Sequence, residues 1–159
     1  MNLGGTITQE NPKWAKPLIL YYGLLQTLHL LVLIRAGAIL LMTDSFPFPI
    51  LPPPGGWENQ AIYLMLGLGF TDTISILLGM HFAYRAAFKH QLNRRLGVIS
   101  LTAFITGAIV FGFGTFPSGA WAAHPFAYGI MVVLFLPSIW LYIWLLKSNL
   151  KPGKKQPVI

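Results

Sequence analysis

Four long apolar stretches constrain this chain more than any other feature of its sequence. They cover residues 17–42, 61–84, 96–116 and 125–146. Each reaches the roughly 20 residues that an α-helix needs to cross the hydrocarbon core of a bilayer. Only helices and closed β-barrels satisfy their backbone hydrogen bonds in lipid, and these stretches lack the alternation of barrel strands. We therefore expect an all-α fold: a polytopic membrane protein built as a bundle of four transmembrane helices.

The composition supports the same class and argues against nucleic acid as a partner. Charged residues make up only 9% of the chain, whereas soluble domains average about 25%. The net charge of +7 comes from basic residues at the ends of the apolar stretches, beside Trp and Tyr. Anionic lipid headgroups attract such residues. We predict contact with membrane lipids and no binding of nucleic acid.

Ten of the eleven Lys and Arg residues fall on one side of the expected bundle. They occur within residues 13–16, 85–95 and 147–155, and the connections 43–60 and 117–124 contain none. Because short loops rich in Lys and Arg stay in the cytoplasm, both termini are expected there. The organisation expected is an N-terminal segment 1–16, a membrane domain 17–146 and a basic tail 147–159. A bacterial or archaeal cytoplasmic membrane is the expected location.

The second apolar stretch carries a small side chain at every fourth position. The strip consists of Gly67, Thr71, Ser75, Gly79, Ala83 and Ala87. Small residues at this spacing let two helix backbones approach closely in lipid. The strip therefore predicts a tight contact of the second helix with the third, or with a partner chain in a homo-oligomer or a larger complex.

Asp72 lies near the middle of the same stretch and is the strongest candidate for function. By helical geometry it stands about 60° from Ser75, at the edge of the small strip, and so faces protein. A carboxylate at this depth costs roughly 2.5–3.5 kcal/mol on insertion scales, and such residues are functional candidates by default. The alternative is a structural role, with Asp72 hydrogen-bonded to neighbouring hydroxyl groups.

The first helix presents Tyr22, Gln26 and His29 on one face, and His29 lies at about the depth of Asp72. This face suits a ligand's polar group or proton transfer, and interhelical hydrogen bonding is the structural alternative. Arg35, the one basic residue outside the cytoplasmic pattern, is expected to pair with Asp72 or else to reach outward to Asp44 or Glu58. The candidate ligand-binding residues are Tyr22, Gln26, His29, Arg35, Asp72 and Ser75.

Metal and haem binding are not expected. No two His residues are spaced at i, i+3 or i, i+4, and the chain has no Cys. His29 and His81 differ in depth by about 10 Å at helical rise, which misaligns them for one cofactor. We predict no metal and no cofactor.

The proline-rich connection 43–60 is expected to be a rigid connector, with a lid over the bundle as the alternative.

Two classes of function remain. The preferred one is non-enzymatic: a binder of lipid or another small apolar molecule, or an accessory subunit of a membrane complex, because no motif supplies an oriented acid, base and electrophile. The alternative is an intramembrane enzyme acting on an apolar substrate, with Asp72 as acid or base and His29 and Tyr22 assisting. A small transporter is a third, weaker hypothesis.

The enzyme alternative resembles, in outline, the emopamil-binding protein superfamily, which includes sterol isomerases. The resemblance lies in the four-helix layout, the carboxylate on the second helix, the aromatic richness and the basic C-terminal tail. It implies isomerase-like chemistry on a sterol- or isoprenoid-like substrate. The acidic residue of the family's first helix has no counterpart here, where His29 and Arg35 are the ionisable groups, so no site residue is transferred.

Overall fold

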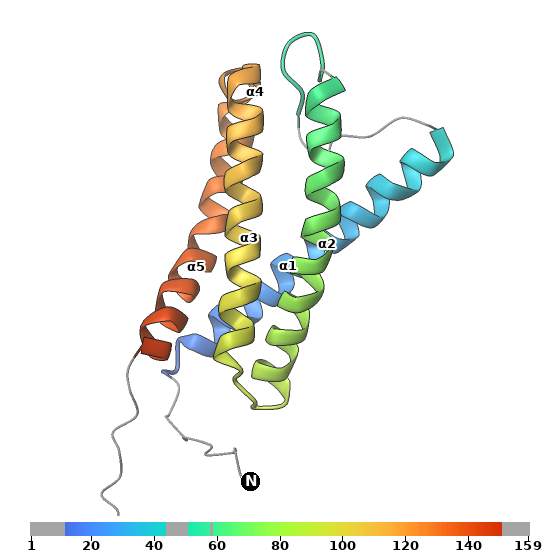
Figure 1. Ribbon diagram of the computed structural model, residues 1–159. Helices are drawn as coiled ribbons and strands as arrows, with labels where there is room; N and C mark the ends of the chain where they lie inside the picture. Colours follow the sequence, from blue (N-terminus) through green and yellow to red (C-terminus); the bar gives the residue numbers. More distant parts are fainter. Residues whose placement is uncertain (1–11, 44–50, 58, 151–159) are drawn as a thin grey trace, which may run out of the picture.

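The computed structural model describes residues 12–43, 51–57 and 59–150, and every element in that part of the chain is helical. The elements are α1 (Ala15–Thr43), α2 (Asn59–Phe88), α3 (Arg94–Thr115), the 3₁₀ turn η1 (Phe116–Ser118), α4 (Ala120–Ala123) and α5 (Pro125–Leu150). The four long helices are all long and apolar enough to cross a membrane (Figure 1). The all-α class with four such helices, expected from the sequence, is confirmed.

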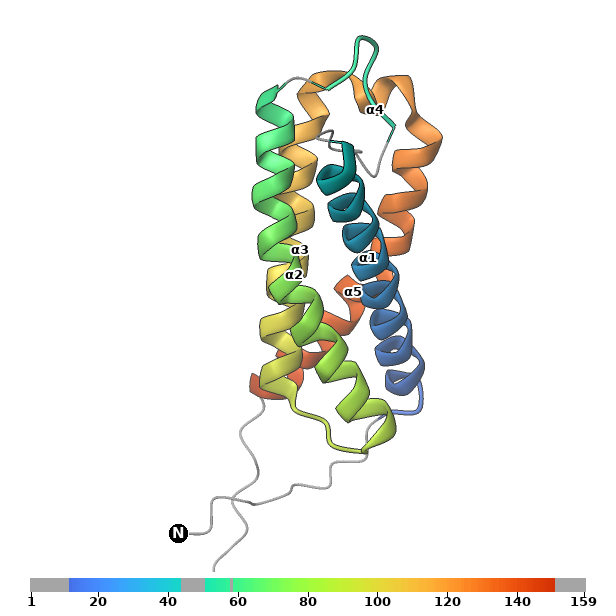
Figure 2. The same ribbon diagram turned by 90° about the vertical axis from the view of Figure 1, so that its right-hand side faces the viewer.

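The long helices form a ring in which each contacts its two neighbours. Contacts join α1 to α2, α2 to α3, α3 to α5 and α5 to α1, and consecutive long helices run in opposite directions (Figures 1 and 2). The start of α1, the α2–α3 turn and the end of α5 therefore meet at one end, which we call the basic end. The opposite end carries residues 51–57 and α4, and we call it the loop end.

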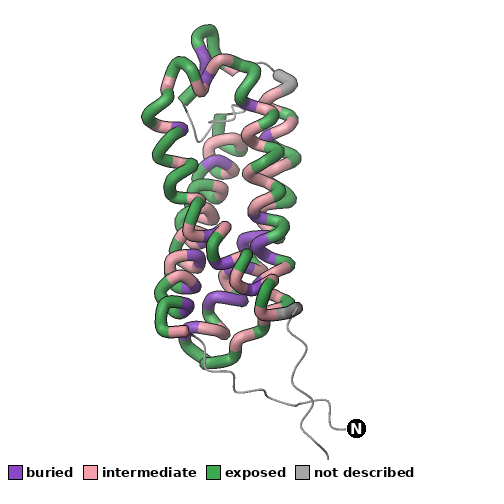
Figure 3. The backbone as a smooth tube through the Cα atoms, turned by 90° about the vertical axis from the view of Figure 1, so that its left-hand side faces the viewer, coloured by how far each residue is buried: buried purple, intermediate pink, exposed green. Residues whose placement is uncertain are grey.

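The buried core lies in the half of the bundle nearest the basic end (Figure 3). It consists of Ile19, Tyr22, Phe82, Ala83, Leu101, Phe104, Leu141 and Leu145. Towards the loop end α1 leans away from α3 and α5 (Figures 1 and 2), and its last residues Leu41 and Met42 are 87% and 83% exposed. The bundle is thus closed at the basic end and open on one side further along.

The helices extend beyond the apolar stretches that predicted them. α2 continues past Tyr84 to Phe88, and the chain then turns at His90, which has a positive φ of 55°, while the Gln91 N–H donates to the Arg85 carbonyl. Asn93 caps α3 by accepting a hydrogen bond from the Leu96 N–H at 3.1 Å. The length of an apolar stretch therefore differs from the length of its helix, because capping residues set where a helix ends.

Two local features lie outside the straight parts of the four helices. The segment 117–124 contains most of η1 and all of α4. Pro137 lies inside α5, where it removes one backbone donor, and α5 changes direction in its second half (Figure 2).

The expected contact of α2 with α3 is present, and the small strip also packs closely on α1. A Cβ built on Gly23 of α1 would lie 2.7 Å from Cβ of Ala83, and one built on Gly79 would lie 2.8 Å from the Tyr22 hydroxyl. Ser75 of the strip faces α3, where it donates to the Ser100 carbonyl at 3.3 Å. The strip does not extend into the core along its whole length, because Gly67 and Thr71 are exposed.

Candidate functional site

Three helices meet in a buried polar link in the middle of the bundle. The Tyr22 hydroxyl of α1 and the Ser100 hydroxyl of α3 are 2.7 Å apart, and Ser75 of α2 donates to the Ser100 carbonyl. All three side chains are at most 2% exposed. Gly79 makes room for the Tyr22 hydroxyl, since any side chain there would overlap it. Ser100 is the centre of this link, and the sequence interpretation did not include it.

Gln26 lies one helical turn beyond Tyr22 and is completely buried. Its side-chain amide lies near the Tyr22 hydroxyl, but neither its nitrogen nor its oxygen makes a hydrogen bond of normal geometry to the described residues. A primary amide offers two donor hydrogens and two acceptor lone pairs, and an unpaired buried polar group costs about 1–3 kcal/mol. The interior of this bundle therefore contains unused hydrogen-bonding capacity beside the Tyr22–Ser100–Ser75 link.

His29 and Asp72 come together on the side of Gln26 away from the basic end. Their Nε2 and Oδ2 atoms are 3.8 Å apart, and their side chains are 32% and 19% exposed. The His29 ring meets the Phe104 ring edge-on, with centroids 6.5 Å apart. A Cβ on Gly107 would lie 2.6 Å from Oδ1 of Asp72. A glycine of α3 is therefore what allows the carboxylate to occupy this position.

Arg35 does not join this group. Its side chain is exposed, and no ion pair links it to Asp72. The expected Arg35–Asp72 pair is therefore wrong: the part of α1 towards the loop end leans away from the bundle (Figure 1), and Arg35, in the second half of α1, is exposed. The other expected partners of Arg35, Asp44 and Glu58, lie outside the described residues.

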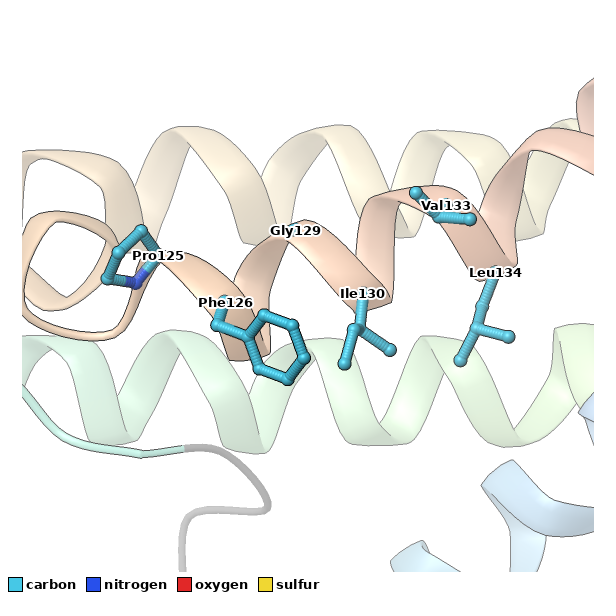
Figure 4. A pocket seen from close by; sticks show the side chains of 6 residues that line it. All are labelled: Pro125, Phe126, Gly129, Ile130, Val133 and Leu134. Carbon is cyan, nitrogen blue, oxygen red and sulfur yellow. The ribbon is translucent and has the colours of Figure 1, made fainter.

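A shallow, open groove of about 390 Å³ lies along the half of α5 nearest the loop end, and all the residues that line it belong to this helix. Its walls are apolar and come from Pro125, Phe126, Gly129, Ile130, Val133 and Leu134. Phe126, Ile130 and Leu134 follow each other at intervals of one turn and point to the same side of the helix (Figure 4). The groove is about 12 Å long at helical rise between Phe126 and Leu134.

The inner end of the groove is joined to the polar residues by aromatic contacts. The Tyr21 hydroxyl of α1 donates to the Leu134 carbonyl, which ties α1 to α5 there. The next residue, Phe135, stacks on Phe104 with ring centroids 4.7 Å apart, and Phe104 contacts His29. The rings of Phe135 and Phe104 therefore connect the apolar surface of α5 to the polar cluster.

Residues 51–57 lie over the loop end and are fixed to it. His124 Nε2 is 3.0 Å from the Pro52 carbonyl, and the Tyr128 hydroxyl donates to the Leu51 carbonyl at 3.1 Å. Trp121 stacks on Tyr128 with ring centroids 4.7 Å apart. This described part of the proline-rich connection therefore covers the bundle end next to the groove, and residues 44–50 of the same connection lie outside the described part.

Of the six candidate residues, the structure gathers Tyr22, Gln26, Ser75, His29 and Asp72 along one interior path and leaves Arg35 outside. Phe104 and Gly107 were missed by the sequence interpretation. Both lie one or two turns from Ser100 along α3, but a phenylalanine and a glycine are common in any apolar stretch. Comparisons with protein-family models, with curated proteins and with solved structures found no match.

Proposed function

We propose that this is an integral membrane protein that binds one amphiphilic small molecule within the bilayer. The apolar part of the ligand lies along the α5 groove, and its polar group meets Gln26, His29 and Asp72. The basic end lies in the cytoplasm, with both termini, because ten of eleven Lys and Arg residues belong to segments on that side. The protein acts as a binder and not as a catalyst.

The observation that carries this proposal is the unpaired, fully buried amide of Gln26 next to the His29–Asp72 pair. In lipid no bulk water reaches such groups, so a ligand with a hydroxyl, carbonyl or amine supplies the missing hydrogen bonds. The apolar groove nearby favours a molecule that is otherwise hydrocarbon. A ligand of this kind enters from the membrane through the side where α1 diverges.

Native mass spectrometry of the gently extracted protein tests the proposal. The wild type should carry one small molecule per chain. Asp72→Asn should lose at least tenfold in retention, since a hydrogen bond to a charged group contributes about 1.5–3 kcal/mol. The control is Thr106→Val, a change of similar size on the exposed side of α3, which should retain the ligand. Equal retention by both variants would contradict the site.

The enzymatic alternative rests on one observation, the 3.8 Å separation of a histidine nitrogen and a carboxylate oxygen. These two groups are able to pass a proton to and from an apolar substrate such as a sterol or an isoprenoid. The small molecule recovered by native mass spectrometry allows a test of whether the protein is a binder or an enzyme. If the purified protein converts that ligand to an isomer and Asp72→Asn does not, the protein is an enzyme. A stoichiometric protein partner without a small molecule indicates an accessory subunit instead.

A further inference from the structure

A second groove, of about 340 Å³, lies between α1 and α2 in the half nearest the basic end. Its apolar walls include Leu20 and Leu24 of α1 and Met80, Tyr84 and Phe88 of α2. Its floor is the contact of Gly23 with Ala83, where a Cβ on Gly23 would lie 2.7 Å from Cβ of Ala83. The groove extends to Thr27 and so follows α1 for about 10 Å at helical rise. It is separate from the α5 groove and from the polar cluster.

Basic side chains flank the mouth of this groove at the basic end. Nζ of Lys89 lies 5.7 Å from the centre of the Tyr84 ring, and Tyr84 is part of the wall. Lys16 precedes Leu20 by four residues and therefore stands above it on the same face of α1. Both lysines are exposed.

Among the described residues at the basic end, no acidic side chain offsets this charge. Residues 12–20, 80–100 and 140–150 contain no Asp or Glu. The groove therefore combines a hydrocarbon-lined channel with a positively charged mouth, and the mouth lies at the level of the membrane surface if the helices span the bilayer.

We infer that this groove binds an anionic phospholipid. One acyl chain lies along the floor between α1 and α2, and the phosphate sits between the ammonium groups of Lys16 and Lys89. The Tyr84 ring, already engaged by Lys89, holds that side chain at the mouth. The charge of the mouth favours an anionic over a zwitterionic headgroup, because a choline or ethanolamine ammonium would be repelled by the two lysines. This site does not depend on the ligand proposed above.

Native mass spectrometry with added lipid tests this inference. The wild type in detergent is titrated with phosphatidylglycerol and with phosphatidylcholine that has the same acyl chains, and it should retain one phosphatidylglycerol far more tightly. In the double variant Lys16→Gln/Lys89→Gln the affinity for phosphatidylglycerol should fall about 25-fold, because each basic residue contributes roughly a factor of five. The matched control is Arg95→Gln/Lys147→Gln, which removes the same charge at the same end, away from the groove.

A third variant tests the apolar part of the groove. Thr27→Phe fills the groove without changing the charge, and it should weaken binding of phosphatidylglycerol while leaving both lysines in place. The inference is overturned if the two double variants weaken binding equally, since the attraction would then be diffuse. It is also overturned if phosphatidylcholine binds as tightly as phosphatidylglycerol, or if Thr27→Phe leaves the affinity unchanged.

Discussion

Gln26 and Tyr22 lie one turn apart on α1, are equally buried, and differ in how well their polar atoms are satisfied. The Tyr22 hydroxyl has Ser100 at 2.7 Å, whereas both polar atoms of Gln26 lack a partner among the described residues. In the absence of ligand, the Tyr22 side chain stabilises the bundle and the Gln26 side chain destabilises it. A residue kept at such a cost is typical of a binding site, where strain or unmet polarity in the free protein is relieved by the ligand.

This difference predicts opposite signs for two substitutions. Gln26→Leu should raise the stability of the ligand-free protein by about 1–3 kcal/mol, because it removes an unpaired buried amide while keeping the volume similar. Tyr22→Phe should lower it by about 1–2 kcal/mol, because it leaves Ser100 without its partner. The measurement is unfolding in mixed detergent of protein stripped of bound molecules. Destabilisation of similar size by both substitutions would show that the Gln26 amide is satisfied in the free protein.

At the scale of elements, the crossing of α1 and α2 is set by small residues of α2 facing α1. Gly79 admits Tyr22 and Gln26, and Ala83 meets Gly23. Close backbone approach is the main source of attraction between helices in lipid, where apolar burial contributes little. The same crossing places His29 beside Asp72, so packing and site geometry are coupled.

Gly79→Ala should therefore destabilise the bundle by about 1–3 kcal/mol, because its Cβ would lie 2.8 Å from the Tyr22 hydroxyl and 3.0 Å from Cγ of Gln26. The control is Gly112→Ala in α3, where a Cβ has no atom within 4 Å, and which should be neutral or stabilising by up to about 1 kcal/mol. Thermal unfolding of both variants in the same detergent gives the comparison. Equal behaviour of the two would mean that α1 and α2 do not cross at Gly79.

The sequence was sufficient to predict the four helices but not how they pack. Length and apolarity identify each helix because any helix able to cross a bilayer must have both. A strip of small residues does not show which neighbouring helix packs on it, so the strip from Gly67 to Ala87 did not reveal that α1 lies against Gly79 and Ala83. The position of Arg35 depends on where α1 diverges, and divergence follows from packing that no spacing rule encodes. Ser100 was missed because a lone serine in an apolar helix is usually bonded to its own backbone.

At the scale of the whole molecule, the bundle has a closed half and an open half. The core and the Tyr22–Ser100–Ser75 link close the half at the basic end, and residues 51–57 cover the loop end through His124 and Tyr128. Between these two regions lie the α5 groove and the His29–Asp72 pair. This arrangement suits a molecule that enters from the side and not from either aqueous phase.

The proposed topology is open to a direct test because the natural chain has no Cys. Single cysteines are introduced at two exposed positions, Gln91→Cys at the basic end and Ala122→Cys at the loop end. A membrane-impermeant maleimide added to intact cells should label only Ala122→Cys, and both should react once the membrane is opened. Labelling of Gln91→Cys in intact cells would place the basic end outside.

The central claim is that a membrane-derived small molecule occupies the α5 groove, and photocrosslinking from within the groove tests it most directly. A photoreactive phenylalanine analogue replaces Ile130 in the groove or, as control, Ile143 of the same helix, which is similarly exposed at 43% against 44% but lies outside it. After irradiation of native membranes, the account predicts one defined adduct mass from position 130, lost in combination with Gln26→Leu, and only a spread of bulk lipids from position 143. The same spread of lipids from both positions would contradict it.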